Sequence, residues 1–378
     1  MMQKRMGVRL VLFKIMNGLR SISLKTQVRR LKYFSVFSQL LGRKGAIMHS
    51  FAIAVNNWVE IHRDDLRDYT SPTGEINPKN SNQRNKSVLI KKNVVTQSLK
   101  NYTEAAKSLG LIHQEKERLY PSYLLIILQN LNKNLNTEAL KNQYNLHEVE
   151  KIFFLYTIIK YDADIFLCVY KMLCLEPELN LTKYQKKFQS YYIEYLEKKL
   201  RDDSKKNNQA IFEVYQRVNN WQKPKRYSES IVPPRLNWCI DLGLVNYFSE
   251  GEDRWIPLYE YEQIRKINSE HFFTEAINLF KIDNTRRWES VENNEKENLM
   301  FKYIQLARSL FGVLKLPRLP HQNTLLLLSF KLLQDHKIVA EPEQIGNWIG
   351  FERKINNLII GIRKTGRTYE SYIYLKNG

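Results

Sequence analysis

The sequence predicts a mainly α protein with small β-hairpins, an α+β architecture in which helices alternate with short pairs of strands. Three observations lead to this prediction. Apolar residues recur at helical spacing over much of the 378-residue chain. A helix that ends in Leu-Gly is followed by two short extended segments twice, at 96–125 and at 234–258. The composition, 43% hydrophobic and 26% charged, is typical of a folded chain.

The first 59 residues hold a concentrated positive charge. They contain eleven Lys and Arg residues and no Asp or Glu, which is more than half of the formal net charge of +20. An excess of this size favours a polyanionic partner. Three interpretations of residues 1–49 stay open: an organelle transit peptide, a basic arm that follows a phosphate backbone, or sequence upstream of a start at Met48 rather than Met1. We expect a cytoplasmic, nucleoid-associated protein, or an organellar one if the first interpretation holds.

Residues 50–125 form the expected N-terminal domain, which contains the first of the repeated patterns. A helix at 50–68 precedes a polar loop rich in Pro, Gly, Asn and Ser. A second helix begins at Thr96, whose hydroxyl can cap it, and ends before Gly110, where a left-handed backbone is least costly for glycine. Two strands of a hairpin are then expected within 111–125.

The polar side of this second helix is a candidate nucleic-acid surface. Amides can pair with adenine edges and lysines with phosphates, so this face can be turned toward a groove. The alternative is an amphipathic helix with its polar side in water, and Glu104 favours it because a carboxylate is repelled by phosphates. The candidate binding residues of this domain are Gln97, Lys100, Asn101 and Lys107, with Arg84, Lys91 and Lys92 in the segment before the helix.

Residues 126–222 predict a helical middle domain. Apolar periodicity places helices at 138–160, 164–175, 183–199 and 210–221. Tyrosines recur through this block, and rings of this kind can stack on bases. Because they recur at helical spacing, we favour core positions with the hydroxyl at the edge.

Residues 223–261 repeat the helix and hairpin pattern. The helix begins at Pro233-Pro234, where a missing N–H does no harm, and closes at Leu242-Gly243. The hairpin turn at 250–253 is acidic and would repel phosphate. We therefore expect this second unit to contact proteins. A helical segment, 262–316, follows it.

Residues 317–378 form the expected C-terminal unit. Helices are predicted at 324–334 and 342–355, and a hairpin joins LIIGIR to TYESYIYL through a basic turn. A basic turn is typical of a hairpin that touches a phosphate backbone. The candidate binding residues here are Arg353, Arg363, Lys364 and Arg367, with Lys354 and Lys376 close in sequence.

Motifs for catalysis and cofactors are mostly missing from the sequence. It contains no Gly-rich phosphate loop, dinucleotide fingerprint or nucleophile elbow, and its seven histidines and three cysteines lack metal-ligand spacing. We expect no catalytic residues, no metal and no cofactor. One loose match exists: Asp335 with Glu352-Arg353-Lys354 fits the acid plus Glu-x-Lys spacing of restriction-type nucleases, although the second part falls on a predicted helix. The longest apolar run is too short for a bilayer, so we expect no membrane partner.

The pattern of helix, Leu-Gly-Leu-[Ile/Val] and hairpin at 96–125 and 234–258, with a divergent copy at 324–375, resembles the winged-helix superfamily, a form of helix-turn-helix protein. The resemblance implies tandem winged-helix-like units flanking the middle domain, a helix in the major groove of double-stranded DNA, and wing contacts to its backbone. We expect a non-enzymatic DNA-binding protein, either a regulator or the DNA-recognising subunit of a multi-protein machine of the mobile-element or defence type. The alternatives are a structural adaptor whose winged helices bind proteins and a metal-dependent nuclease.

Overall fold

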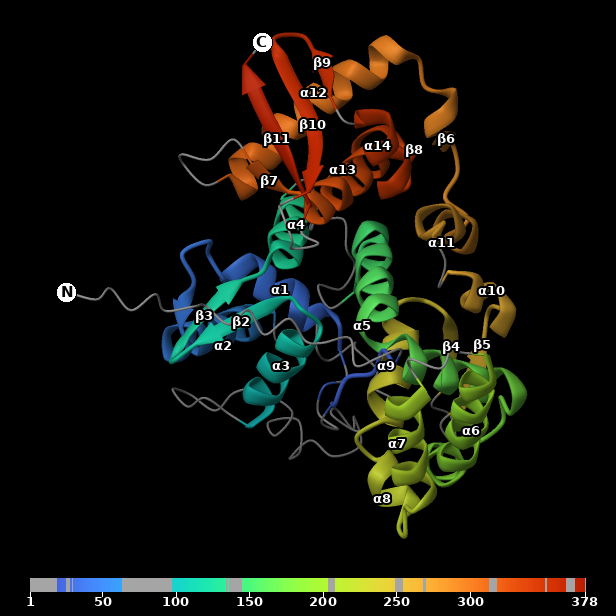
Figure 1. The fold of residues 1–378 in the computed structure, drawn as a ribbon. Helices are drawn as coiled ribbons and strands as arrows, with labels where there is room; N and C mark the ends of the chain where they lie inside the picture. Colours follow the sequence, from blue (N-terminus) through green and yellow to red (C-terminus); the bar gives the residue numbers. More distant parts are fainter. Residues whose placement is uncertain are drawn as a thin grey trace, which may run out of the picture.

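A computed structural model describes residues 19–24, 28, 30–62, 97–133, 135, 145–202, 208–248, 254–267, 270–312, 318–350, 352–364 and 371–377. The described protein is mainly helical, with small sheets at its two ends and in its middle (Figure 1). The predicted fold class, mainly α with small β-hairpins, is thereby confirmed. Figure 1 shows the N-terminal part at the left, the middle part at the lower right and the C-terminal part at the top.

In its described residues, the N-terminal unit has three helices and a three-stranded antiparallel sheet. Its elements are α1 (Lys32–Leu40), β1 (Ala46–Ile47), α2 (Met48–Ile61), α3 (Gln97–Ser108), β2 (Ile112–Glu115) and β3 (Arg118–Pro121). The strand order is β1-β3-β2. The helix predicted from Thr96 is present from Gln97, and the proposed cap Thr96 lies outside the described residues. The strand predicted to reach residue 125 ends at Pro121, because Ser122 caps a new helix, α4 (Tyr123–Asn132), by accepting a hydrogen bond from the Leu125 N–H at 3.3 Å.

The described part of residues 19–49 belongs to the folded core, which corrects the expectation of a separate leader or arm. Leu24 and Leu31 are buried, and α1 itself lies within this segment. Two of its cations are also buried. Arg30 forms an ion pair with Asp241 at 2.7 Å and Lys32 one with Glu150 at 3.1 Å. These side chains are therefore occupied inside the protein and are not available to a phosphate backbone.

The middle part is built around α5. Its elements are α5 (Glu148–Leu175), α6 (Leu181–Asp202), α7 (Asn208–Asn219), α8 (Pro224–Ser228), α9 (Val232–Asp241), β4 (Val245–Phe248), β5 (Arg254–Pro257), α10 (Tyr261–Lys266) and α11 (Phe272–Phe280). α5 is one continuous helix where the sequence predicted two. The acidic residues at the predicted break are neutralised internally: Asp162 receives two hydrogen bonds from Arg235, at 2.7 and 2.8 Å, and Asp164 one from Lys199 at 2.7 Å.

Helices α3 and α9 end in the same way, as their shared Leu-Gly predicts. Gly110 and Gly243 both adopt positive φ, +67° and +71°. The N–H of Leu111 donates to Ala106 and that of Leu244 to Cys239, the long hydrogen bond of a Schellman end. A hairpin follows each helix, β2–β3 in one case and β4–β5 in the other. The pattern therefore predicts the local backbone correctly at both sites.

The surroundings of α9 differ from those of α3, and whether 223–261 is a winged-helix-like unit stays a prediction. The helix is buried along Val232–Cys239, including the guanidinium of Arg235. Within the described residues, the hairpin that follows α9 forms a sheet of only two strands, β4 and β5. A helix enclosed in this way cannot enter a groove. The acidic turn at 250–253 lies outside the described residues.

The described C-terminal unit contains the elements of the N-terminal unit in the same order, with additional short strands and a 3₁₀ turn before and between them. Short β6 (Arg286–Arg287) and the 3₁₀ turn η2 (Trp288–Ser290) precede α12 (Asn293–Phe311), β7 (Arg318–Pro320), α13 (His321–His336), β8 (Ile338–Val339), α14 (Pro342–Ile349), β9 (Arg353–Ile355), β10 (Leu358–Lys364) and β11 (Ser371–Asn377). The sheet order is β7-β11-β10-β9, and β6 pairs with β8. The helix predicted at 342–355 ends at Ile349, because Gly350 breaks it at φ +62° and the chain turns back as β9.

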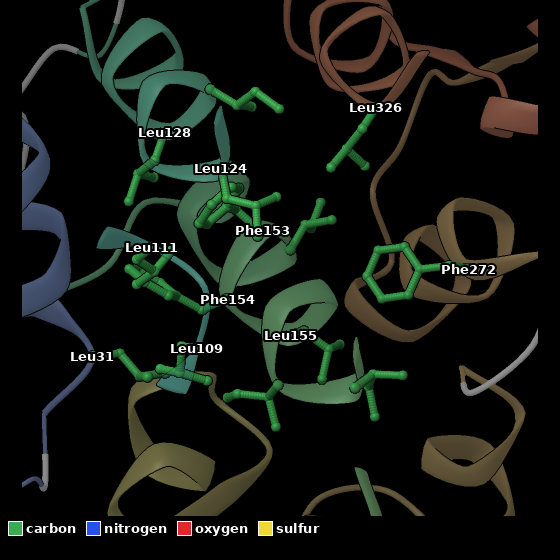
Figure 2. Packing of buried hydrophobic residues seen from close by; sticks show 14 of the residues in the cluster. Leu31, Leu109, Leu111, Leu124, Leu128, Phe153, Phe154, Leu155, Phe272 and Leu326 are labelled. Carbon is green, nitrogen blue, oxygen red and sulfur yellow. The ribbon is translucent and has the colours of Figure 1, made fainter. Parts of the chain in front are cut away.

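Side chains from all three parts meet on α5. Figure 2 shows Phe153, Phe154 and Leu155 of α5 surrounded by residues of the neighbouring segments. The labelled neighbours are Leu31 before α1, Leu109 and Leu111 after α3, Leu124 and Leu128 of α4, Phe272 of α11 and Leu326 of α13. All ten are buried. One continuous hydrophobic cluster therefore joins the two terminal units to the middle part.

Candidate nucleic-acid interface

The exposed side of α3 carries part of the predicted binding surface. Gln97 and Lys100 are exposed, whereas Asn101 is only 6% exposed and accepts a hydrogen bond from the Gln97 amide at 3.0 Å. Asn101 therefore lies toward the inside and is removed from the predicted groove-facing set. Its burial follows from its position beside Tyr102 and Ala105, which face the core from the same helix.

The charge of Lys107 is partly balanced by neighbours on the same surface. Its ammonium forms an ion pair with Glu104 at 2.5 Å and donates to the Gln114 side chain at 3.2 Å. Gln114 belongs to β2, so this contact ties the helix to the hairpin. Lys107 thus lies beside the hairpin on the polar side of α3, and the neighbouring Glu104 carboxylate reduces the attraction of its ammonium to a phosphate.

The β2–β3 hairpin beside α3 has mixed charge. Its exposed residues include Glu115, Lys116, Glu117 and Arg118, two of each sign. His113 adds little charge at neutral pH, because burial lowers the pKa of its imidazole more than Glu115 raises it. The His113 ring stacks on Tyr120 with 5.2 Å between centroids. The described surface of α3 and the β2–β3 hairpin is therefore polar and carries both signs of charge.

The C-terminal candidates lie on the four-stranded sheet. Arg353 places its guanidinium over the Trp348 ring at 4.1 Å, and Arg363 lies over the Tyr374 ring at 4.3 Å. Lys364 ends β10. α3 lies at the lower left of Figure 1 and the β10–β11 hairpin at the top, so the two sets of predicted residues form separate surfaces. Arg84, Lys91, Lys92 and Arg367 lie outside the described residues.

Three residues on the C-terminal sheet were not singled out as candidates from the sequence. These are Arg318, Tyr372 and Tyr374. The alternation of tyrosines with Ile373 and Leu375 is a sequence signal that places the two rings on the face opposite to the core. Arg318 gives no such signal, because only the pairing of β7 with β11 brings it beside them.

The proposed nuclease residues have different partners. Asp335 accepts hydrogen bonds from Lys331 at 2.8 Å and from Tyr303 at 2.9 Å, while Glu352 accepts one from the Tyr374 hydroxyl at 2.7 Å. Glu352 directly precedes strand β9, whereas the sequence predicted that it lies within a helix. Among the described residues, no three His, Cys, Asp or Glu side chains lie together as ligands for a metal ion. In the same ranges, no helix is long and apolar enough to cross a bilayer.

Comparison with known proteins gives no relative on which to base a function. No family model matches the chain, and no curated protein and no solved structure matches it at a significant level.

Proposed function

We propose that this protein binds double-stranded DNA without catalysing a reaction on it, and that its two terminal units are winged helices. The observation that supports this proposal is the repeated order of elements. Helix, strand, two helices and two strands occur as α1, β1, α2, α3, β2, β3, and α12, β7, α13, α14, β10, β11 follow the same order once the short strands β8 and β9 are set aside. In the N-terminal sheet the last strand, β3, lies between β1 and β2. In the four-stranded C-terminal sheet the last strand, β11, lies between β7 and β10, and β9 follows β10 at the edge. Units of this kind commonly place their third helix in the major groove.

In the N-terminal unit the third helix is α3, and its exposed face supplies the contacts of the proposal. Lys100 is placed to meet a phosphate, and Gln97 can offer its amide to a base edge or to the backbone. The formal charge of +20 favours approach to any polyanion. We therefore assign the duplex contact to the α3 surface, defined as Gln97, Lys100 and Lys107. A regulator and a DNA-recognising subunit would both use such a surface.

A salt-titrated binding measurement tests the proposal. Fluorescence anisotropy with a labelled duplex is expected to show log affinity falling linearly with log salt concentration. Replacing Lys100 with Ala removes one phosphate contact and should lower the magnitude of that slope by about 1. Lys198→Ala is the matched control, because it removes an exposed lysine from α6, a helix that Figure 1 shows at the lower right, away from α3. Salt-independent binding, or identical slopes for the two variants, would reject the α3 surface.

A second candidate function, a protein-binding adaptor, is supported by the outer side of the β4–β5 hairpin. Phe248, Ile256 and Leu258 are 50%, 44% and 47% exposed, although the other side of the hairpin is packed on the core through Trp255. Exposed apolar side chains grouped in this way are typical of protein contacts. A pull-down from nuclease-treated extract separates the two functions. An adaptor would retain its partner after nuclease treatment and lose it in Phe248→Ser/Ile256→Ser, whereas a partner bridged by DNA would be lost on treatment alone.

A further inference from the structure

The outer face of the C-terminal sheet gathers several cationic side chains. Ile360, Ile373 and Leu375 point into the core, so their strand neighbours point outward. The helices α13 and α14 pack against strands of this sheet, and the buried side chains place them on its inner side. We define the outer sheet face as Arg318, Lys354, Arg363, Tyr372, Tyr374 and Lys376.

Two arginines are held flat on two tyrosines across this face. Tyr374 pairs with Arg318 in the strand register, and Tyr372 pairs with Arg363. Each guanidinium nevertheless lies over the diagonal ring: Arg318 is 4.6 Å from the Tyr372 centroid and Arg363 is 4.3 Å from the Tyr374 centroid. Diagonal neighbours on a sheet lie within reach of long side chains. The result is two planar cation–π stacks side by side.

The surroundings of these stacks keep them in place. Gly361 lies opposite Tyr374 in the register and offers no side chain, which leaves room for the ring above it. The Tyr374 hydroxyl donates to Glu352 at 2.7 Å, and this contact fixes the ring. Arg318, Lys354, Arg363 and Lys376 are all exposed. Four cations of the described residues therefore share the face with the carboxylate of Glu352.

The helix of this unit that corresponds to α3 offers much less to a nucleic acid. The segment Pro342–Ile349 contains no Lys or Arg, and its exposed residues include Glu343 and Asn347. A carboxylate on a groove-facing helix is repelled by phosphates. Arg318, Lys354, Arg363 and Lys376 lie instead on the outer sheet face.

We propose that the outer sheet face binds single-stranded nucleic acid, with unpaired bases stacked on the two Arg–Tyr pairs and the phosphates next to Lys354 and Lys376. Unpaired bases stack on aromatic rings and on arginine guanidinium planes, and positive side chains beside them follow the backbone. A duplex hides the faces of its bases, so it cannot use these planes in the same way. The outer sheet face differs from the α3 surface in its position and in the class of nucleic acid that it would bind. The proposal for the outer sheet face does not depend on duplex binding by the α3 surface.

Binding of labelled oligothymidylate and oligouridylate by the full chain tests the proposal and distinguishes DNA from RNA as the source of the strand. Arg318→Ala/Arg363→Ala is expected to weaken binding about tenfold or more, because both guanidinium planes on which bases would stack are lost. Arg318→Lys/Arg363→Lys keeps the charge and loses the planar stack, so it is expected to bind less tightly than the unaltered protein with a similar salt dependence. Thermal melting confirms that both variants remain folded.

Lys198→Ala/Arg201→Ala on α6 is the control, because it removes the same charge from an exposed surface of the middle part. The proposal is overturned if this control weakens single-strand binding as much as the Arg318/Arg363 alanine variant does. It is also overturned if the lysine variant binds as tightly as the unaltered protein. Lys100→Ala should leave single-strand binding unchanged, so a failure of the duplex proposal and a failure of this one give different results.

Discussion

Apart from the extra short strands β8 and β9, the N-terminal and C-terminal units pass through the same order of helices and strands, but they expose different side chains. In the N-terminal unit the third helix, α3, presents Gln97 and Lys100, and its short hairpin carries both signs of charge. In the C-terminal unit the third helix presents Glu343, and the longer hairpin carries the Arg–Tyr stacks. The same scaffold therefore offers a polar helix at one end of the molecule and a cationic, aromatic sheet at the other. The order of helices and strands alone therefore does not predict which surface of a unit would bind a nucleic acid.

The two units are also joined to the middle part by different interactions. Lys32 of α1 meets Glu150 of α5 in a buried ion pair, and Arg30 meets Asp241 at the end of α9. In the C-terminal unit, Phe330 of α13 lies among rings of the middle part, 5.7 Å from that of Phe153 and 4.9 Å from that of Phe273. Buried charges tolerate the loss of one partner poorly, whereas apolar contacts weaken in proportion to the atoms removed.

The largest expected effect concerns the ion pair that holds the N-terminal unit. Glu150→Ala leaves the Lys32 ammonium buried without its carboxylate, so the free energy of unfolding should fall by about 3–5 kcal/mol. Urea denaturation followed by circular dichroism measures this change. Glu194→Ala, which breaks the exposed pair with Lys171, is the control and should change stability by about 1 kcal/mol or less.

The double variant Lys32→Met/Glu150→Leu sharpens the result, because removing both charges should recover most of the loss. A single Glu150→Ala variant as stable as the Glu194→Ala control would show that the pair does not hold the unit in place.

An intermediate effect is expected at the ends of α3 and α9. Gly243→Ala places an L-residue at φ +71° in open surroundings, where the nearest atom is Lys151 Nζ at 3.4 Å, and should cost about 1–2 kcal/mol. Gly110→Ala should cost more, because the new Cβ would lie 2.6 Å from the Tyr161 hydroxyl and the ring must move. Thermal melting of both variants measures the difference. Equal losses of stability in the two variants would mean that backbone strain alone accounts for the loss at both positions.

The smallest expected effect compares one carboxylate on each third helix. Glu104→Gln frees Lys107 from its ion pair and removes a negative charge from the α3 surface, so duplex affinity should rise a few-fold at low salt. Glu343→Gln removes the same charge from α14 and should leave duplex affinity unchanged. Anisotropy at one low salt concentration is sufficient. A larger gain for Glu343→Gln would move the duplex contact to the C-terminal helix.

The sequence predicted local structure well where the cause is local. Leu-Gly ends two helices and alternating residues form the hairpins, because both depend on backbone conformation and on the spacing of apolar residues. The helix break predicted between 160 and 164 was wrong, because the buried Asp162 accepts hydrogen bonds from Arg235, which lies 73 residues away in the sequence. Asn101 was placed on the wrong side for a related reason. Its polar side chain suggested solvent, although its position beside Tyr102 turns it toward the core.

What the amino-acid sequence determined by itself is the fold class, the hairpins, the excess of positive charge and the absence of known catalytic motifs. Only the tertiary structure decided how that charge is used. Arg30 and Lys32 turn inward because buried carboxylates require partners, while Arg318 and Arg363 turn outward because β7 pairs with β11 and aligns them with two tyrosines. Periodicity fixes which residues share a face of one element. Which other segment packs against that face depends on contacts between residues that are distant in the sequence, and periodicity holds no information on those contacts.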